Sequence, residues 1–194
     1  MTTKYPAPQE TTPGQQLSNN RLLITLTIIA LSLVFACLIY SNFIVRNAQG
    51  SWPPAGVDRM DSLTPLLMTA ILILSSGAAI MAVRSLKAGQ RGPLLTYLYV
   101  TIGGGLIYSV WMLAFLARLL TTFNGVYSAL FLALWFVHVV HAVAVLLYLG
   151  YVTAQVRRGR YSVAEGWFPL EGSTNLWHFV TIVWIVLFVV LYIV

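Results

Sequence analysis

The sequence predicts an all-α membrane protein built as a polytopic bundle of five transmembrane helices. Of its 194 residues, 59% are hydrophobic and only 8% are charged, whereas soluble domains carry about 25% charged residues. The apolar residues also fall into five runs, each long enough to cross a hydrocarbon core that needs roughly 20 helical residues. These runs are 22–45, 64–83, 94–117, 127–153 and 176–194. The short loops between them leave room for a single transmembrane domain, 21–194.

Residues 1–20 precede the first run and are rich in Thr, Gln and Pro without apolar periodicity. This composition is typical of a disordered polar tail. Because the run that follows is longer than the apolar core of a secretion signal, we expect it to be a retained helix. Cys37 is the single cysteine, so the sequence offers no internal disulfide and no cysteine cluster for an iron–sulfur centre or a copper site.

The basic residues alternate between the two ends of the expected bundle, eight at one end and three at the other. The larger group is Lys4, Arg21, Arg84, Lys87, Arg91, Arg157, Arg158 and Arg160, and the smaller is Arg46, Arg59 and Arg118. The positive-inside rule then predicts a cytoplasmic N-terminus and an extracytoplasmic C-terminus. The net charge of +6 therefore reflects topology, and we expect no nucleic-acid partner. We expect a multi-pass protein of the bacterial inner (plasma) membrane, with the mitochondrial inner membrane as the less favoured alternative.

Three short segments predict local packing. Small residues cluster at 75–79 (SSGAA) and 103–105 (GGG), which favours close helix contacts over a gap for a substrate. Ser173 or Thr174 is expected to cap the last helix, with Glu171 near the positive end of its dipole. The stretch Trp52, Pro53 and Pro54 predicts a stiff loop, because proline fixes the backbone, with Trp52 anchored at the membrane interface.

His138 and His141 share a face of the fourth helix, because residues three apart are neighbours on a helix. Such groups inside a membrane suggest function. Haem ligation would need an imidazole from another helix at the same depth, and His178 lies more than two helical turns away in depth. A metal site or proton relay would need carboxylates, but no Asp or Glu lies within the five runs. We therefore favour neutral imidazoles that hydrogen-bond neighbouring helices or a partner subunit.

The C-terminal stretch LEGSTNLWHFVTIVWIVLFVVLYIV resembles subunit III of the haem–copper oxidases, whose last helix opens with Glu, a short spacer and Trp-His-Phe-Val. Two further motifs fit the same family: its Trp-Pro-Pro loop, and its Gly-Val-Tyr segment followed at a fixed interval by a histidine pair. The matching residues include Trp52, Pro53, Pro54, Gly56, His138, His141, Glu171, Trp177 and His178. The resemblance runs from about Arg21 to the C-terminus and is to the five-helix form of the family.

This resemblance implies a non-catalytic subunit of a respiratory terminal oxidase, which reduces dioxygen to water with electrons from cytochrome c or a quinol. It implies that haem and copper belong to the partner catalytic subunit, so that any enzymatic activity is that of the complex. The implied roles are packing against subunit I, support of its assembly and stability, and phospholipid binding. Subunit II, other subunits and a larger respiratory supercomplex are further implied partners.

Two alternatives remain for the function. One is a subunit III-like accessory protein of nitric oxide reductase, which shares the scaffold. The more remote alternative is a haem-binding membrane cytochrome. The sequence departs from the oxidase family where Thr181 replaces an aspartate, and its first helix lacks the family's membrane-embedded glutamate. We therefore expect no carboxylate-based proton role for this chain.

Overall fold

The computed structural model describes residues 12–54, 60–121, 125–161 and 167–193, and over these residues it is helical with no strand. In chain order the helices are α1 (Pro13–Asn47), α2 (Leu63–Lys87), α3 (Arg91–Thr121), α4 (Gly125–Arg157) and α5 (Phe168–Phe188), which continues as a short π-helix, η1 (Val189–Ile193). Within the described residues, five helices are long and apolar enough to cross a membrane. The predicted all-α bundle of five transmembrane helices is therefore confirmed.

Helix α1 begins at Pro13 rather than at Leu22, so residues 13–20 are helical and not part of a disordered tail. Thr12 forms a capping box with Gln15: the Gln15 amide donates to Thr12 Oγ1 at 3.4 Å, and the Thr12 amide donates to Gln15 Oε1 at 2.9 Å. Pro13 occupies the first turn, where a missing amide hydrogen costs nothing. The expectation for residues 1–11 lies outside the described residues, as do Gly56 and Arg59.

Helix α5 also begins earlier than expected. Trp167 is its N-cap residue and Pro169 lies in its first turn. Ser173 and Thr174 are therefore inside the helix, where both hydroxyls donate to the carbonyl oxygen of Leu170 at 3.0 Å. The prediction that one of them caps the helix is wrong, because the helix begins almost two turns earlier, with a proline in its first turn. Glu171 lies in the first turn, near the positive end of the helix dipole as expected.

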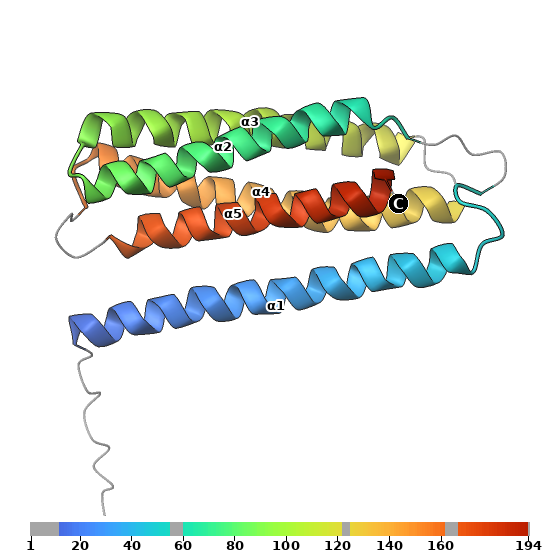
Figure 1. Ribbon diagram of the computed structural model, residues 1–194, viewed down its shortest axis with the longest axis horizontal. Helices are drawn as coiled ribbons and strands as arrows, with labels where there is room; N and C mark the ends of the chain where they lie inside the picture. Colours follow the sequence, from blue (N-terminus) through green and yellow to red (C-terminus); the bar gives the residue numbers. More distant parts are fainter. Residues whose placement is uncertain (1–11, 55–59, 122–124, 162–166, 194) are drawn as a thin grey trace, which may run out of the picture.

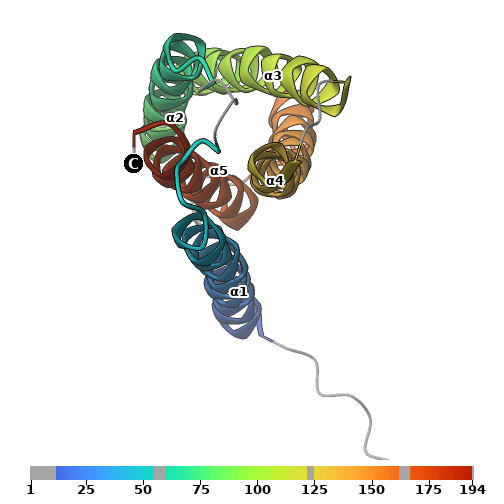
Figure 2. The same ribbon diagram turned by 90° about the vertical axis from the view of Figure 1, so that its right-hand side faces the viewer.

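Helices α2, α3, α4 and α5 surround a common core, and α1 lies outside this group against α5 (Figures 1 and 2). Helix α1 also touches α4, less extensively. Its inward side chains recur with heptad spacing, which suits a left-handed crossing of two helices. They include Leu17, Ile24, Leu31 and Leu38, all partly covered, together with the buried Phe35 and Asn42.

The two small-residue segments bring α2, α3 and α5 close together. A Cβ atom on Gly104 would lie 2.8 Å from Ser75 Cβ, and one on Gly105 would lie 2.7 Å from Trp177 Cη2. Real Cβ atoms do not approach so closely, so both positions require glycine. Gly103 has no atom within 4 Å of the equivalent point. The expectation of close helix contacts is confirmed at Gly104 and Gly105.

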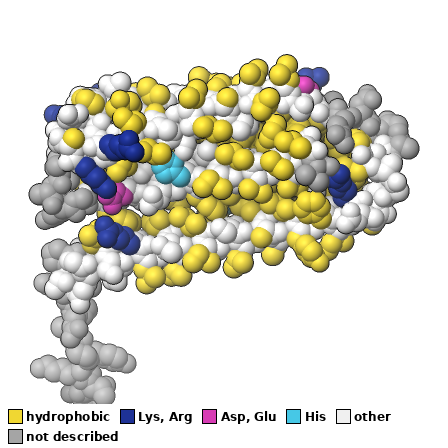
Figure 3. Space-filling view, in the orientation of Figure 1, with side chains coloured by type: hydrophobic (Ala, Val, Ile, Leu, Met, Phe, Trp, Pro, Cys, Tyr) yellow, Lys and Arg dark blue, Asp and Glu magenta, His cyan; other side chains and the backbone are white. Residues whose placement is uncertain are grey.

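One end of the bundle gathers basic side chains, and we call it the basic end. It holds Arg21, Arg84, Lys87, Arg91, Arg157 and Arg158, and basic side chains gather around an acidic one at the left of Figure 3. Helix α1 starts at this end and η1 finishes at the opposite end (Figure 1). The odd number of spans among the described residues accounts for this arrangement. Which end faces the cytoplasm stays a prediction.

At the opposite end, Asp61 stabilises the start of α2. Its carboxylate accepts hydrogen bonds from the Leu63 amide at 3.1 Å, and from the Thr64 amide and hydroxyl at 3.3 and 2.9 Å. The Leu63 amide, followed by the Thr64 hydroxyl, lowers the pKa of Asp61 below its ordinary value. At the same end, Trp52 packs edge-on against Tyr127 of α4, with ring centroids 5.0 Å apart, so the Trp52 loop is held against the bundle.

Candidate functional site

Helix α5 carries the family-like residues and is bound to α2 by three polar contacts. Trp184 Nε1 donates to Thr69 Oγ1 at 2.8 Å, and Trp177 Nε1 donates to Ser75 Oγ at 3.1 Å. The third contact joins His178 Nδ1 and Ser76 Oγ, 2.6 Å apart. Both indoles are fully enclosed. These contacts fix the rotation and the depth of α5 relative to α2.

The two hydroxyls that accept hydrogen bonds from the indoles also donate hydrogen bonds to backbone carbonyls. Thr69 Oγ1 donates to Pro65 O and Ser75 Oγ donates to Thr101 O, each at 2.8 Å. Each hydroxyl therefore both accepts and donates, which suits a water-free interior. Because Thr101 belongs to α3, the contact of Trp177 with Ser75 links three helices.

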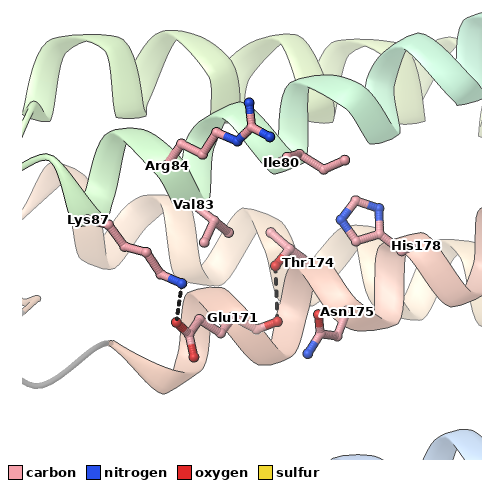
Figure 4. A pocket seen from close by; sticks show the side chains of 8 residues that line it. All are labelled: Ile80, Val83, Arg84, Lys87, Glu171, Thr174, Asn175 and His178. Carbon is pink, nitrogen blue, oxygen red and sulfur yellow. Dashed lines mark hydrogen bonds and ion pairs between the residues drawn. The ribbon is translucent and has the colours of Figure 1, made fainter.

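A groove of about 420 Å³ opens between α2 and α5 near the basic end. Its lining combines apolar, cationic and hydrogen-bonding side chains (Figure 4): Ile80, Val83, Arg84, Lys87, Glu171, Thr174, Asn175 and His178. Glu171 lies 3.5 Å from Lys87 Nζ and 3.8 Å from Arg21 Nη2. Arg84 forms no ion pair within the described residues, and the one hydrogen bond of its guanidinium there is a long one to Met81 Sδ at 3.9 Å. The groove is therefore cationic on balance.

His138 lies in the centre of the bundle and is fully enclosed. Its ring packs against Trp184, Phe35 and Tyr108, with centroid distances of 5.5, 6.1 and 6.1 Å. Neither ring nitrogen has a hydrogen-bond partner among the described residues. Within this part of the chain, His138 acts as one aromatic ring among several.

His141 lies one turn further along α4 and is half-buried. Its Nδ1 is 2.6 Å from the carbonyl oxygen of Val137, on the same helix, and its ring packs edge-on against Phe35 at 5.6 Å. Phe35 of α1 thus contacts both imidazoles. Within the described residues neither imidazole hydrogen-bonds another helix, so inside this chain the pair joins α1 to α4 through ring contacts.

The structure does not bring the three histidines together. His178 lies about 15 Å from the start of α5, and His138 about 28 Å from the end of α4, both measured from the basic end at 1.5 Å per residue. Among the described residues no three His, Cys, Asp or Glu side chains are grouped so that they would hold a metal ion. Within the described residues, His178 and the His138–His141 pair therefore lie at different depths of the bundle.

Sequence reasoning identified Trp177, His178 and Glu171 but not their partners on α2. Thr69 and Ser76 are seven residues apart and so lie on the same face of α2. This spacing of two hydroxyl residues could have indicated a polar contact with a neighbouring helix. The small residues of the Ser75–Ala79 segment predict only close packing, although Ser75 and Ser76 also supply hydroxyls. The contacts of Phe35 could not be predicted, because an aromatic residue in an apolar helix is common.

The fold and these contacts define a multi-pass helical membrane protein whose interior polar groups mainly serve helix association. The family described as cytochrome c oxidase subunit III matches residues 14–194. A curated relative named cytochrome c oxidase subunit 3, from Ornithorhynchus anatinus, is 32% identical over 146 residues. Relatives of the same name from Madoqua guentheri and Latimeria chalumnae are each 30% identical over 146 residues.

Each of these alignments covers 74% of this chain and 55% of the relative, so the chain spans little more than half the length of the curated relatives it matches. The chain belongs to the cytochrome c oxidase subunit III family, and the resemblance inferred from its motifs is confirmed.

Proposed function

We propose that this chain is a non-catalytic subunit III of a respiratory haem–copper oxidase and supports the assembly and stability of the catalytic subunit. The observation that carries the proposal is the family match over residues 14–194, which includes every helix except the first residue of α1. The complex would reduce dioxygen to water with electrons from cytochrome c or a quinol. Subunit I would pack directly against this chain, with subunit II and other subunits nearby.

The second part of the proposal is that haem and copper are held by the catalytic subunit and not by this chain. The environment of His138 supports it, because aromatic rings from α1, α3 and α5 contact the imidazole and the side chain is fully enclosed. The roles of Trp177 and Trp184 also support it, since their polar atoms are committed to α2. The chain would then act as a rigid scaffold.

The third part is that the groove between α2 and α5 binds phospholipid. Arg84 and Lys87 lie at the basic end, where a lipid phosphate sits, and Ile80 lies further towards the middle of the bundle (Figure 4). Basic pockets between transmembrane helices on the cytoplasmic side bind anionic headgroups. Arg84→Gln should lower the phospholipid phosphorus that co-purifies, whereas Arg158→Gln, at the end of α4, should not. Equal lipid content in both variants would contradict this part.

Purification of the tagged chain in a mild detergent, followed by mass spectrometry, tests the main proposal. The expected result is the catalytic subunit of a haem–copper oxidase in stoichiometric amount, from a bacterial plasma membrane with the basic end cytoplasmic. Co-purification of a nitric oxide reductase catalytic subunit would favour the accessory-protein alternative. Recovery of the chain with neither subunit would contradict both.

A further inference from the structure

His141 offers an acceptor nitrogen that the described part of the chain does not use. The carbonyl oxygen of Val137, 2.6 Å from Nδ1, can only accept a hydrogen bond, so Nδ1 carries the proton. In a neutral imidazole the other nitrogen, Nε2, is then an acceptor. Nε2 makes no hydrogen bond to the described residues and is not one of the enclosed polar atoms, which include both ring nitrogens of His138. It therefore reaches the surface of the chain.

This acceptor lies in the middle of the bilayer. His141 is the central residue of α4, about 24 Å from each end of the helix at 1.5 Å per residue. The hydrocarbon core of a bilayer is about 30 Å thick, so water and lipid headgroups lie beyond reach in both directions. Lipid acyl chains have no hydrogen-bond donor, and an unsatisfied polar atom at this depth is unfavourable.

Three exposed hydroxyls in the apolar part of α1 differ from His141, because each donates a hydrogen bond within its own helix. The hydroxyls of Thr27, Ser32 and Ser41 donate to carbonyl oxygens four residues earlier on their own helix. An acceptor such as Nε2 cannot be satisfied by its own helix, because the backbone amides in the middle of a helix already donate to helix carbonyls. No described residue of this chain supplies a donor to Nε2, which leaves a donor on a neighbouring chain.

The surface around His141 suits a helix. Phe35 covers one side of the ring, and beside it α4 exposes Val140 and the small side chain of Ala144, one turn from His141. Small residues let a neighbouring helix backbone approach closely. Helix α1 borders this surface, and among the described residues Phe35 and Asn42 are its only buried side chains. A partner helix at this place would contact both α1 and α4.

We propose that the face formed by His141, Val140 and Ala144 of α4, beside Phe35 of α1, docks a transmembrane helix of another subunit. That helix donates a side-chain hydrogen bond to His141 Nε2 from Ser, Thr, Asn, Gln, Tyr or Trp at mid-bilayer depth. The proposal rests on the proposed function, since it takes the chain to be a subunit of a complex. A second copy is the weaker occupant, because the hydroxyls of α1 just described already donate within their own helix.

Retention of the chain in its complex tests this surface. His141→Leu removes the acceptor, and about a three- to tenfold fall in the fraction of chain that co-purifies with the catalytic subunit is expected. His141→Gln, which keeps an acceptor, should restore most of the binding. Ala144→Trp should also weaken retention through bulk, whereas Val110→Trp, on the exposed side of α3, should not. Thermal unfolding of each variant alone checks that the chain itself stays folded.

Site-specific cross-linking identifies the occupant. A photoreactive residue at position 144 should cross-link to a transmembrane helix of the catalytic subunit, and one at position 110 should not. Unchanged retention of His141→Leu, or a cross-link from position 144 to a second copy, would overturn the docking proposal. Failure of the wild-type chain to co-purify with any catalytic subunit would instead refute the proposed function.

Discussion

The indole nitrogen of Trp184 donates a hydrogen bond to the hydroxyl oxygen of Thr69 at 2.8 Å, and the Thr69 hydroxyl in turn donates to the carbonyl oxygen of Pro65 at 2.8 Å. This pair joins the second half of α5 to the first turns of α2. The contact of Trp177 with Ser75 repeats the arrangement two turns away. Helix association in lipid depends on packing and such polar contacts, because burial of apolar surface gives little driving force there.

The Trp184–Thr69 contact predicts the effect of Thr69→Val, which keeps the shape of the side chain but removes the hydroxyl. Trp184 Nε1 would be left buried and unpaired, so the free energy of unfolding in detergent should fall by about 1–3 kcal/mol. A double-mutant cycle with Trp184→Phe measures the coupling between the two side chains. Additive effects of the two substitutions would show that this hydrogen bond does not contribute.

The close contact at Gly105 predicts a difference between neighbouring glycines. Gly105→Ala places a methyl group 2.7 Å from Trp177 Cη2 and 2.8 Å from Leu146 Cδ1, and such overpacking should cost about 1–3 kcal/mol. Gly103→Ala meets no atom within 4 Å and serves as the matched control. Thermal unfolding in the same detergent compares the two, and equal melting temperatures would contradict the packing described for α3 and α5.

Glu171 predicts a small effect that depends on salt. Its partners Lys87 and Arg21 are 65% and 62% exposed, and exposed ion pairs are worth about 0–1 kcal/mol. Glu171→Gln should therefore lower the unfolding free energy by less than about 1 kcal/mol, and the difference should shrink as ionic strength rises. A large loss that persists in high salt would mean that Glu171 has a role beyond these two ion pairs.

The two central histidines should behave differently from each other. His138 is enclosed by aromatic rings without a hydrogen-bond partner in the described residues, so His138→Leu should leave retention in the complex within about twofold, because no polar contact is lost. His141→Leu should weaken retention as argued above. Neither substitution should change the haem spectrum of the complex that remains. Loss of haem from a complex that still holds the His138→Leu chain would show that this residue supports the redox site.

The class of fold could be predicted because hydropathy alone identifies membrane-spanning helices. The starts of α1 and α5 could not, because they depend on the capping box of Thr12 and Gln15 and on Pro169 in the first turn of α5, which apolar runs do not report. His138 and His141 were correctly placed on one helix, but the ring contacts with Phe35 depend on how α1 is rotated. That rotation is set by the packing of the whole bundle. The pairing of Trp184 with Thr69 could not be predicted for the same reason.

The optical spectrum of the chain, expressed alone and compared with the complex purified through the same tag, tests the central claim most directly. We predict that the isolated chain is folded, helical and colourless, while the complex shows the haem absorption of its catalytic subunit. A Soret band that stays with the isolated chain, and disappears in His138→Leu or His141→Leu, would contradict a non-catalytic subunit without redox groups of its own.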